Sequence, residues 1–270
     1  MVTRVPNAPI VVKLGGRALE SPAALAELAQ DLVAVAGRAV VVHGGGPEVS
    51  AWCERLGLAP RFAGGRRVTD EATLEVAVGV LAGLVNKRLV AALRARGVNA
   101  IGLAALDGGL ARVAPHPERA ALGEVGVVEA VDGALLLDLL ARGATPVIAS
   151  IGQTDGRLLN VNADDLAAAL APALGAEALV LLSDAPGLLL QGELVALLDT
   201  PGIEQALASP EVTGGMAPKL QAARTASAQG VENVWIAAWA GAGTLARLLQ
   251  GEGLGTRITR AHSEEEIARG

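Results

Sequence analysis

The sequence predicts a three-layer α/β fold, in which helices cover both faces of a mainly parallel sheet. Short runs of aliphatic and β-branched residues, such as 9–14 and 39–43, alternate with longer segments of helical periodicity. Both of these runs end at glycine clusters that lead into helices. Strands that alternate with helices imply right-handed crossovers, which pair the strands in parallel and place helices on both faces.

Local signals define the elements of the first half of the chain. The first strand ends at a glycine pair, and Ser21 and Pro22 then provide an N-cap and a first-turn proline for a helix that runs to residue 37. After the second strand, a Gly-Gly-Gly-Pro run leads into a helix that closes at Gly57. The next expected elements are a hairpin at 59–68, a long helix at 70–96, a strand at 99–103, and hairpins rather than helices over 109–131.

The alternation of strands and helices resumes in the second half. The expected elements are, in chain order, a helix at 134–142, a strand at 145–150, a hairpin through Asp155-Gly156, a helix at 163–174, a strand at 178–183, a hairpin through Gly192, a helix at 216–229, a strand at 233–239 and a helix at 244–249. No internal repeat, low-complexity tract or flexible linker interrupts the sequence. We therefore expect residues 1–270 to form a single domain.

Composition and charge exclude several classes of function. A net charge of −6 and only four aromatic residues, three Trp and one Phe, argue against a nucleic-acid-binding protein. The single cysteine, Cys53, excludes a disulfide framework and a cysteine-cluster metal site, and it fits a reducing compartment. Prolines interrupt residues 1–12, which excludes a signal peptide, and charges or glycines break every apolar run before the ~20 residues of a membrane span. The prediction is a cytoplasmic protein that binds neither membranes nor nucleic acids.

Lysine is rare in this sequence, because 19 of the 22 basic residues are arginine and only Lys13, Lys87 and Lys219 are lysine. Lys13 lies in an apolar strand beside glycines, so its ammonium must project into a cleft, since unpaired burial would cost several kcal/mol. Lys219 lies at the start of a helix, where a cation is disfavoured unless an anion compensates it. The sequence around Lys87 indicates only a solvated helix face or a contact with a partner.

Glycine clusters at strand ends are candidate anion sites, because glycine N–H groups and helix N-termini attract negative charge. The clusters are Gly15-Gly16 and Gly44-Gly45-Gly46. Neither cluster matches a Walker loop or a Gly-x-Gly-x-x-Gly fingerprint, so a nucleotide would have to be held in another way. Tight strand-to-helix turns are the alternative explanation of each glycine cluster taken alone.

Two polar clusters complete the candidate site. The arginine pair Arg66-Arg67 precedes a helix capped by Thr69 or Asp70, and a guanidinium is the preferred partner of a carboxylate. The run NVNADD opens another helix with two asparagines and two aspartates, which is more than one helix cap requires. Ordinary capping and a functional role both remain open for that run.

Six motifs, taken in order, resemble the amino acid kinase superfamily and, most closely, the acetylglutamate kinases of arginine biosynthesis. They are KLGG, HGGGP, GRRVTD, NVNADD, LLSDAPG and GGMAPK, and the resemblance covers residues 11–258. It implies transfer of the γ-phosphoryl group of MgATP to the side-chain carboxylate of N-acetyl-L-glutamate, which gives an acyl phosphate. The implied fold is an open αβα sandwich, with a lobe at 1–176 for the amino acid and dimerisation and a lobe at 177–270 for ATP.

The resemblance also implies roles for individual residues. Lys13 and Lys219 would stabilise the transferring phosphoryl group, and Asp164 would hold both ammonium groups in position. The N-acetylglutamate would contact Gly45, Gly46, Arg67 and Asn160, and the nucleotide would contact Gly15, Gly16, Asp184, Ala185, Pro186, Gly187, Leu188, Leu189, Glu211, Val212 and Thr213. ATP would carry the magnesium ion, so no protein side chain is expected to bind metal.

The physical requirements of this reaction match those residue types. A carboxylate nucleophile is already ionised at pH 7, so the reaction needs no general base, and His43 is expected to be structural. The reaction needs positive groups that cancel the repulsion between two anions and that stabilise the charge on the phosphoryl oxygens. Two lysines, glycine N–H groups and Mg²⁺ supply the positive charge and the donors.

Two alternatives remain open at this stage. The related kinase of lysine biosynthesis acts on an amino acid attached to a small acidic carrier protein, and it shares Arg61, Phe62 and the run GLVNKR with this chain. HGGGP and NVNADD favour a free substrate instead. The other alternative is a catalytically inactive ligand sensor on the same fold, against which the presence of Lys13, Asp164 and Lys219 argues.

The oligomeric state is a further expectation. Arginine-inhibited members of the family carry an extra N-terminal helix that links dimers into a hexamer, and only about nine residues precede the first strand here. The resemblance therefore predicts a homodimer that is insensitive to arginine.

Overall fold

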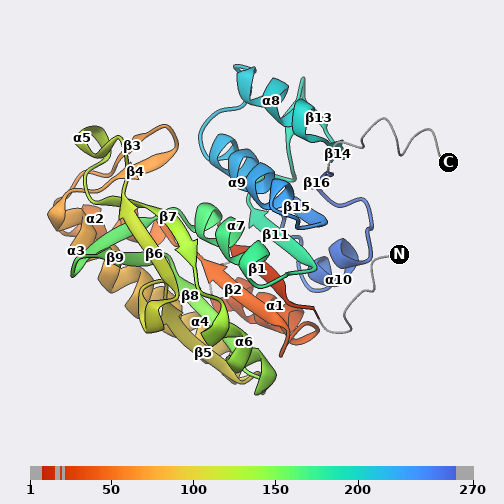
Figure 1. The fold of residues 1–270 in the computed structure, drawn as a ribbon, viewed down its shortest axis with the longest axis horizontal. Helices are drawn as coiled ribbons and strands as arrows, with labels where there is room; N and C mark the ends of the chain where they lie inside the picture. The colour runs from red at the N-terminus through yellow and green to blue at the C-terminus, as the bar shows by residue number, and fades with distance from the viewer. Residues whose placement is uncertain (1–7, 16–18, 20–21, 260–270) are drawn as a thin grey trace.

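A sheet of eight strands forms the centre of the computed structural model, which describes residues 8–15, 19 and 22–259. Its strands are β1 (Ile10–Leu14), β2 (Ala39–His43), β5 (Ala100–Ala104), β8 (Thr145–Ala149), β11 (Ala178–Ser183), β14 (Leu197–Leu198), β15 (Asn233–Ala238) and β16 (Thr256–Ile258). They are arranged in the order β14-β16-β15-β11-β1-β2-β8-β5 (Figure 1). Within this sheet, every neighbouring pair is parallel except β15 and β16.

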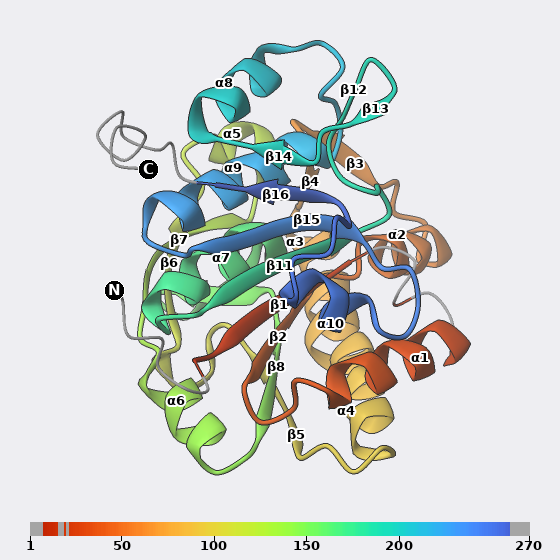
Figure 2. The ribbon, with the colours of Figure 1, turned by 90° about the vertical axis from the view of Figure 1, so that its right-hand side faces the viewer.

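Helices cover both faces of the sheet, so the fold has three layers as the sequence predicts. The helices are α1 (Pro22–Val33), α2 (Gly46–Arg55), α3 (Glu71–Val78), α4 (Asn86–Arg94), α5 (Arg119–Leu122), α6 (Ala134–Ala141), α7 (Ala163–Ala173), α8 (Thr200–Ala208), α9 (Met216–Ala228) and α10 (Thr244–Leu249). Val11 of β1 packs into a core shared with α7 and α9. Its neighbours Ile10 and Val12 pack on the opposite face with α1, α4 and α10. Figure 2 shows these three helices in front of the sheet. The alternation of side chains along a strand explains why β1 contributes to two cores.

Smaller sheets stand beside the central one. Strands β6 (Ala111–Pro115), β7 (Val125–Val131), β9 (Ile151–Thr154) and β10 (Arg157–Val161) form a four-stranded sheet in the order β6-β7-β10-β9. Two separate hairpins consist of β3 (Arg61–Ala63) with β4 (Arg66–Val68), and of β12 (Leu189–Leu190) with β13 (Glu193–Leu194). The sequence predicts the hairpins, but it does not predict that two of them combine into a second sheet.

One long helical stretch runs from Glu71 to Arg94, close to the predicted bounds of 70–96. A π-helical segment, η2 (Gly79–Val85), joins α3 to α4 within it. The stretch is long and apolar enough to pass a length-and-composition test for a membrane span, although the sequence suggested that no apolar run reaches that length. In the structure α4 packs against α1, β5 and β8, as a core helix does.

The differences from the predicted elements lie mostly in short segments. The structure adds α5, α8, β14 and β16 to the expected list. The start of α8 does carry a capping signal, because Asp199 accepts a hydrogen bond from the Gly202 amide at 2.8 Å. The edge strands β14 and β16 have two and three residues, too few to show a periodicity. The predicted N-cap Ser21 lies outside the described residues.

Candidate functional site

A cavity of about 220 Å³ lies at the carboxyl ends of β1 and β2, where an α/β sheet places its ligands. The glycine turns after both strands, the β3–β4 hairpin and the first turn of α7 surround it. Among the predicted site residues, its lining includes Lys13, Gly15, Gly45, Gly46, Arg67, Asn160 and Asp164. The tertiary structure therefore brings residues from four separate motifs to one opening.

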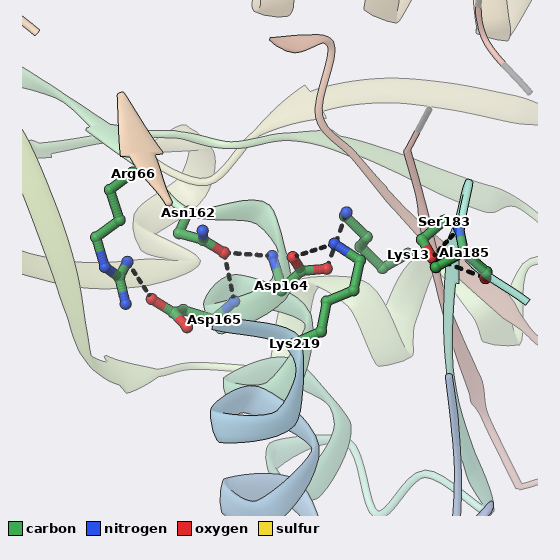
Figure 3. A network of polar contacts seen from close by, with 8 residues as sticks. All are labelled: Lys13, Arg66, Asn162, Asp164, Asp165, Ser183, Ala185 and Lys219. Atoms are coloured by element: carbon green, nitrogen blue, oxygen red, sulfur yellow. Dashed lines mark hydrogen bonds and ion pairs between the residues drawn. The ribbon is translucent and has the colours of Figure 1, made fainter. Parts of the chain in front are cut away.

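Asp164 forms ion pairs with both predicted catalytic lysines. Its Oδ1 lies 2.8 Å from Nζ of Lys13 on β1, and its Oδ2 lies 3.0 Å from Nζ of Lys219 on α9 (Figure 3). The side chain of Asn162 caps α7 and accepts hydrogen bonds from the amides of Asp164 at 2.8 Å and Asp165 at 3.1 Å. The cap fixes the backbone from which the Asp164 carboxylate reaches both ammonium groups.

Burial and mutual charge set the electrostatics of this triad. Only 8% of the Lys13 side chain and 6% of the Asp164 side chain are exposed. Burial lowers the pKa of Lys13, and the charge of Lys219 adds to that effect while Asp164 opposes it. Burial alone would raise the pKa of Asp164, but the two ammonium groups together outweigh it and hold that pKa below its usual range. The buried Lys13 and the partly buried Lys219 thus share one anion, and the excess positive charge suits a phosphoryl group.

The glycine turns leave room for a ligand and for the lysine. A Cβ on Gly15 would lie 2.8 Å from Nζ of Lys13, so a side chain there would collide with the ammonium group. Gly45 has φ 155°, and a Cβ on it would lie 2.8 Å from Cδ2 of Leu81. Position 45 therefore requires glycine, whereas a side chain at position 15 would displace the Lys13 ammonium. Gly16, the other predicted phosphate contact, lies outside the described residues.

Arg67 is held in a fixed position at the wall of the cavity and is only 8% exposed. Its Nη2 donates to the Gly46 carbonyl and to Oγ of Ser50, both at 2.8 Å, and its guanidinium lies 4.8 Å from the centre of the Phe62 ring. Nη1 is buried and has no hydrogen-bond partner in the described part of the chain. A guanidinium with an unused buried donor is suited to bind a carboxylate. The sequence does not predict Ser50, which has no neighbouring motif.

The β3–β4 hairpin contacts both the first turn of α7 and the loop before α9. Nη1 of Arg66 lies 2.7 Å from Oδ2 of Asp165, which points away from Asp164 on the first turn of α7 (Figure 3). A Cβ on Gly65 would lie 2.5 Å from the Gly214 carbonyl oxygen, which belongs to the loop before α9. The hairpin that carries Arg67 therefore rests against the loop that leads to Lys219. The sequence shows the arginine pair but not the partner of Arg66.

Comparison with known proteins identifies the family. A sequence model described as the amino acid kinase family matches residues 8–238. The chain belongs to the amino acid kinase family. This confirms the resemblance of the six motifs and the predicted fold class.

Other amino acid kinases and related proteins are similar to this chain over most of its length. Acetylglutamate kinase of Chloroflexus aurantiacus is 45% identical over 258 residues, which cover 94% of this chain and 98% of that protein. Acetylglutamate kinase of Methanopyrus kandleri is 44% identical over 253 residues, which cover 90% and 98%. The solved N-acetylglutamate synthase of Neisseria gonorrhoeae, in complex with coenzyme A and N-acetyl-glutamate, superposes with a TM-score of 0.81 at 26% identity and covers 97% of this chain and 63% of that one.

Of the predicted nucleotide residues of this amino acid kinase, Gly15 lines the Lys13 cavity, whereas 184–189 and 211–213 lie outside its lining. Residues 184–189 follow β11, and Leu188 donates its amide to Oγ1 of Thr256 at 2.8 Å. The Leu188 side chain is buried in the core, so only its backbone remains for a nucleotide. Oε2 of Glu211 accepts a hydrogen bond from the Gln191 amide at 2.6 Å, which ties the 211–213 segment to the β12–β13 hairpin. The nucleotide role of these residues stays a prediction.

His43 of this amino acid kinase is fully buried at the end of β2. Burial lowers its pKa to about 4, and the charge of Lys87 contributes to the same shift, whereas the hydrogen bond to Gly44 opposes it. The imidazole is therefore neutral at physiological pH, as a structural residue would be.

The depressed pKa of His43 predicts a pH dependence of stability. Between pH 6.5 and pH 4 the unfolded chain binds a proton at His43 that the folded chain does not, so stability is lost as the pH falls through this window. A pKa difference of this size corresponds to roughly 3 kcal/mol. Urea unfolding of the wild type and of His43→Gln at pH 4 and pH 7 measures it. Equal pH dependence in both proteins would contradict the assignment.

Proposed function

We propose that this enzyme transfers the γ-phosphoryl group of ATP to the side-chain carboxylate of N-acetyl-L-glutamate, giving N-acetyl-L-glutamyl 5-phosphate in arginine biosynthesis. The observation that carries the proposal is the Lys13–Asp164–Lys219 triad, of which the buried Lys13 and Asp164 line the same cavity as Arg67. Relatives with 44–45% identity carry the name acetylglutamate kinase, which supports this substrate.

Different residues of the site would bind N-acetylglutamate and the phosphoryl group of ATP. Arg67 would bind a carboxylate of N-acetylglutamate that is not the reacting one, and Asn160, also in the cavity lining, would bind the same molecule. Lys13 and Lys219 would bind the oxygens of the phosphoryl group as it moves, while Asp164 keeps the two ammonium groups from separating. Because the attacking carboxylate is ionised, the reaction needs only alignment and charge stabilisation.

ATP and magnesium are the implied cosubstrate and ion. The described residues contain no cluster of three His, Cys, Asp or Glu side chains that could hold a metal, and two ammonium groups already occupy the Asp164 carboxylate. This donor set fits an ion that the phosphates of ATP bring into the site. Mg²⁺ would neutralise phosphate charge there.

Arg67→Lys should raise the KM for N-acetylglutamate by roughly 10- to 100-fold, because charge-assisted hydrogen bonds are worth about 1.5–3 kcal/mol. Lysine keeps the charge but cannot hold Gly46 and Ser50 while also presenting a second donor to a carboxylate. The KM for ATP should change little. Steady-state kinetics measure both values, and Arg61→Lys is the matched control because Arg61 makes an exposed ion pair with Asp70. An unchanged KM would remove Arg67 from the substrate site.

The assay that tests the function traps the acyl phosphate. Purified enzyme with MgATP and N-acetyl-L-glutamate should form a hydroxamate when hydroxylamine is present, and unacetylated glutamate serves as the control substrate. Absence of the hydroxamate would overturn the proposal. Formation of a hydroxamate only from a substrate attached to an acidic carrier protein would instead support the kinase of lysine biosynthesis.

We also propose that the enzyme is a cytoplasmic homodimer. In the described part of the chain, β5 pairs only with β8 and forms an edge of the sheet, although the Ala100 and Ala104 amides already donate to the Val98 carbonyl and to Asp107. Such an edge can pair with a second copy of the same strand. Cys53 is buried and unpaired, as a reducing compartment permits. Light scattering should give twice the chain mass of 27.1 kDa, and a monomer would contradict the dimer.

A further inference from the structure

We propose that Lys87, Asn86 and His43 form a positioning relay that fixes the Gly44–Gly45 peptide, so that the glycine turn presents its N–H groups to the substrate oxygens. The inference deepens the proposed kinase function and rests on it. It also gives a role to Lys87, which the sequence left as a solvated residue or a partner contact.

The relay begins at the Asn86 side chain, which is buried at the start of α4. Its Nδ2 donates to the Val147 carbonyl at 2.9 Å and to the Leu103 carbonyl at 3.3 Å, and it lies 3.0 Å from Nε2 of His43. Its Oδ1 accepts a hydrogen bond from Nζ of Lys87 at 3.0 Å. A flipped amide would place its oxygen against two carbonyls and its NH₂ group against an ammonium. The Lys87 cation therefore holds the amide in one orientation.

The orientation of Asn86 determines the tautomer of His43. Because an amide NH₂ group accepts no hydrogen bond, the Nε2 that faces it cannot be the protonated nitrogen, and the proton must reside on Nδ1. Nδ1 lies 2.9 Å from the Gly44 carbonyl oxygen and donates to it. The Asn86 amide thus fixes the tautomer of the neutral ring, and the hydrogen bond from the ring fixes the peptide that joins Gly44 to Gly45.

A fixed Gly44 carbonyl also fixes the direction of the next amide. No cis peptide occurs among the described residues, so the Gly45 N–H points opposite to the Gly44 C=O and away from His43. The N–H groups of Gly45 and Gly46 donate to no acceptor in the described part of the chain, and both glycines line the Lys13 cavity. They are therefore available to the oxygens of a substrate carboxylate or phosphoryl group.

The π-helical segment beside the relay also packs against the glycine turn. The π-helical segment η2 ends directly before Asn86, and a Cβ on Gly45 would lie 2.8 Å from Leu81 and 3.3 Å from Val85 of that segment. The helical stretch 71–94 therefore contacts the glycine turn directly through η2 and indirectly through the contact of Asn86 with His43. π-helical turns inside α-helices are frequent at functional sites.

Lysine fits position 87 better than arginine does. A Cβ on Gly102 of β5 would overlap Oδ1 of Asn86 and lie 2.7 Å from Nζ of Lys87, so the ammonium occupies the space that this glycine leaves. A guanidinium is broader than an ammonium, and at this exposed position it would turn toward solvent rather than fit that space. The neighbouring Arg88 instead makes a surface ion pair with Glu48 at 3.1 Å. The chain thus uses its rare lysine where a compact cation is required.

The test uses Lys87→Met and Asn86→Asp, with Arg94→Met as the control for loss of an exposed cation on the same helix. Nitrogen-15 NMR should show His43 protonated on Nδ1 in the wild type and a mixture of tautomers in Lys87→Met. In Asn86→Asp the carboxylate accepts a hydrogen bond, so Nε2 should become protonated. In steady-state kinetics, Lys87→Met should raise the KM for N-acetylglutamate about tenfold, the loss of roughly one hydrogen bond to a charged group. Arg94→Met should change neither measurement.

Two outcomes would overturn the relay. One is an unchanged His43 tautomer and an unchanged KM in Lys87→Met. The other is a change in the oligomeric mass of Lys87→Met in light scattering, because a changed oligomeric state would then explain the raised KM. The NMR measurement needs no substrate, so it reports on the relay even if the wild type fails to phosphorylate N-acetylglutamate, which would refute the proposed function alone.

Discussion

Replacing Asp164 with asparagine should lower kcat by at least about a hundredfold, a loss comparable with removing one preorganised group from a transition state. It should also destabilise the fold, since removal of one partner from a buried ion pair costs about 3–5 kcal/mol. Asp164 is the anion that both ammonium groups share, at 2.8 Å and 3.0 Å. Asparagine would leave the buried Lys13 and the partly buried Lys219 without this counter-charge and would turn an NH₂ group toward one of them. The expected result is loss of the charge on Lys13, whose pKa burial already lowers, together with displacement of Lys219.

Steady-state kinetics and thermal unfolding together measure this effect. Asp165→Asn is the matched control, because Asp165 is the next residue of the same helix turn and pairs with Arg66 rather than with the lysines. The depressed pKa of Asp164 adds a pH test. Its ionised form contributes stability above its unfolded pKa of about 4, and that stability is lost as the pH falls through the lower folded pKa. A wild-type kcat in Asp164→Asn would refute the role of the triad.

The parts of the fold that the sequence predicts are those with local signals. The strand β1 and the helix α7 each combine a regular apolar pattern with a turn or cap at one end, and both lie within one or two residues of the predicted bounds. The second sheet depends on pairing between distant segments, for example Asn160 with Val125, and no periodicity within either segment encodes that partner. Local patterns therefore predict elements better than they predict the sheet to which an element belongs.

The candidate site shows the same division between local and long-range information. The motifs identify Lys13, Asp164 and Lys219, but only the fold shows that one carboxylate lies between both ammonium groups. The contacts of Arg66 with Asp165 and of His43 with Asn86 connect residues that are 99 and 43 positions apart. A motif names the residue types that a reaction needs, whereas the residues that hold them in place become visible only in three dimensions.

Lys13→Arg should lower kcat by roughly a hundredfold or more even though the charge is kept, a loss comparable with removing one preorganised donor from a transition state. The Lys13 ammonium lies 2.8 Å from Oδ1 of Asp164, and a Cβ on Gly15 would lie only 2.8 Å from the same nitrogen. Only 8% of the side chain is exposed, so a larger head group cannot move into solvent. A guanidinium would have to displace either the glycine turn or the carboxylate that also orients Lys219.

Single-turnover kinetics with saturating ATP and N-acetylglutamate measure the chemical step for this variant. Arg38→Lys is the matched control for exchange between the two cations, because Arg38 pairs with Glu177 at 3.1 Å, outside the lining of the Lys13 cavity, and its exchange should leave kcat unchanged. Comparing the two variants distinguishes the effect of the cation's shape on kcat from the effect of its charge. If a compact point charge is what the phosphoryl group requires at position 13, only the Lys13 variant loses the chemical step. Turnover of Lys13→Arg near that of the wild type would show that charge alone suffices and that the space beside Gly15 is not used in catalysis.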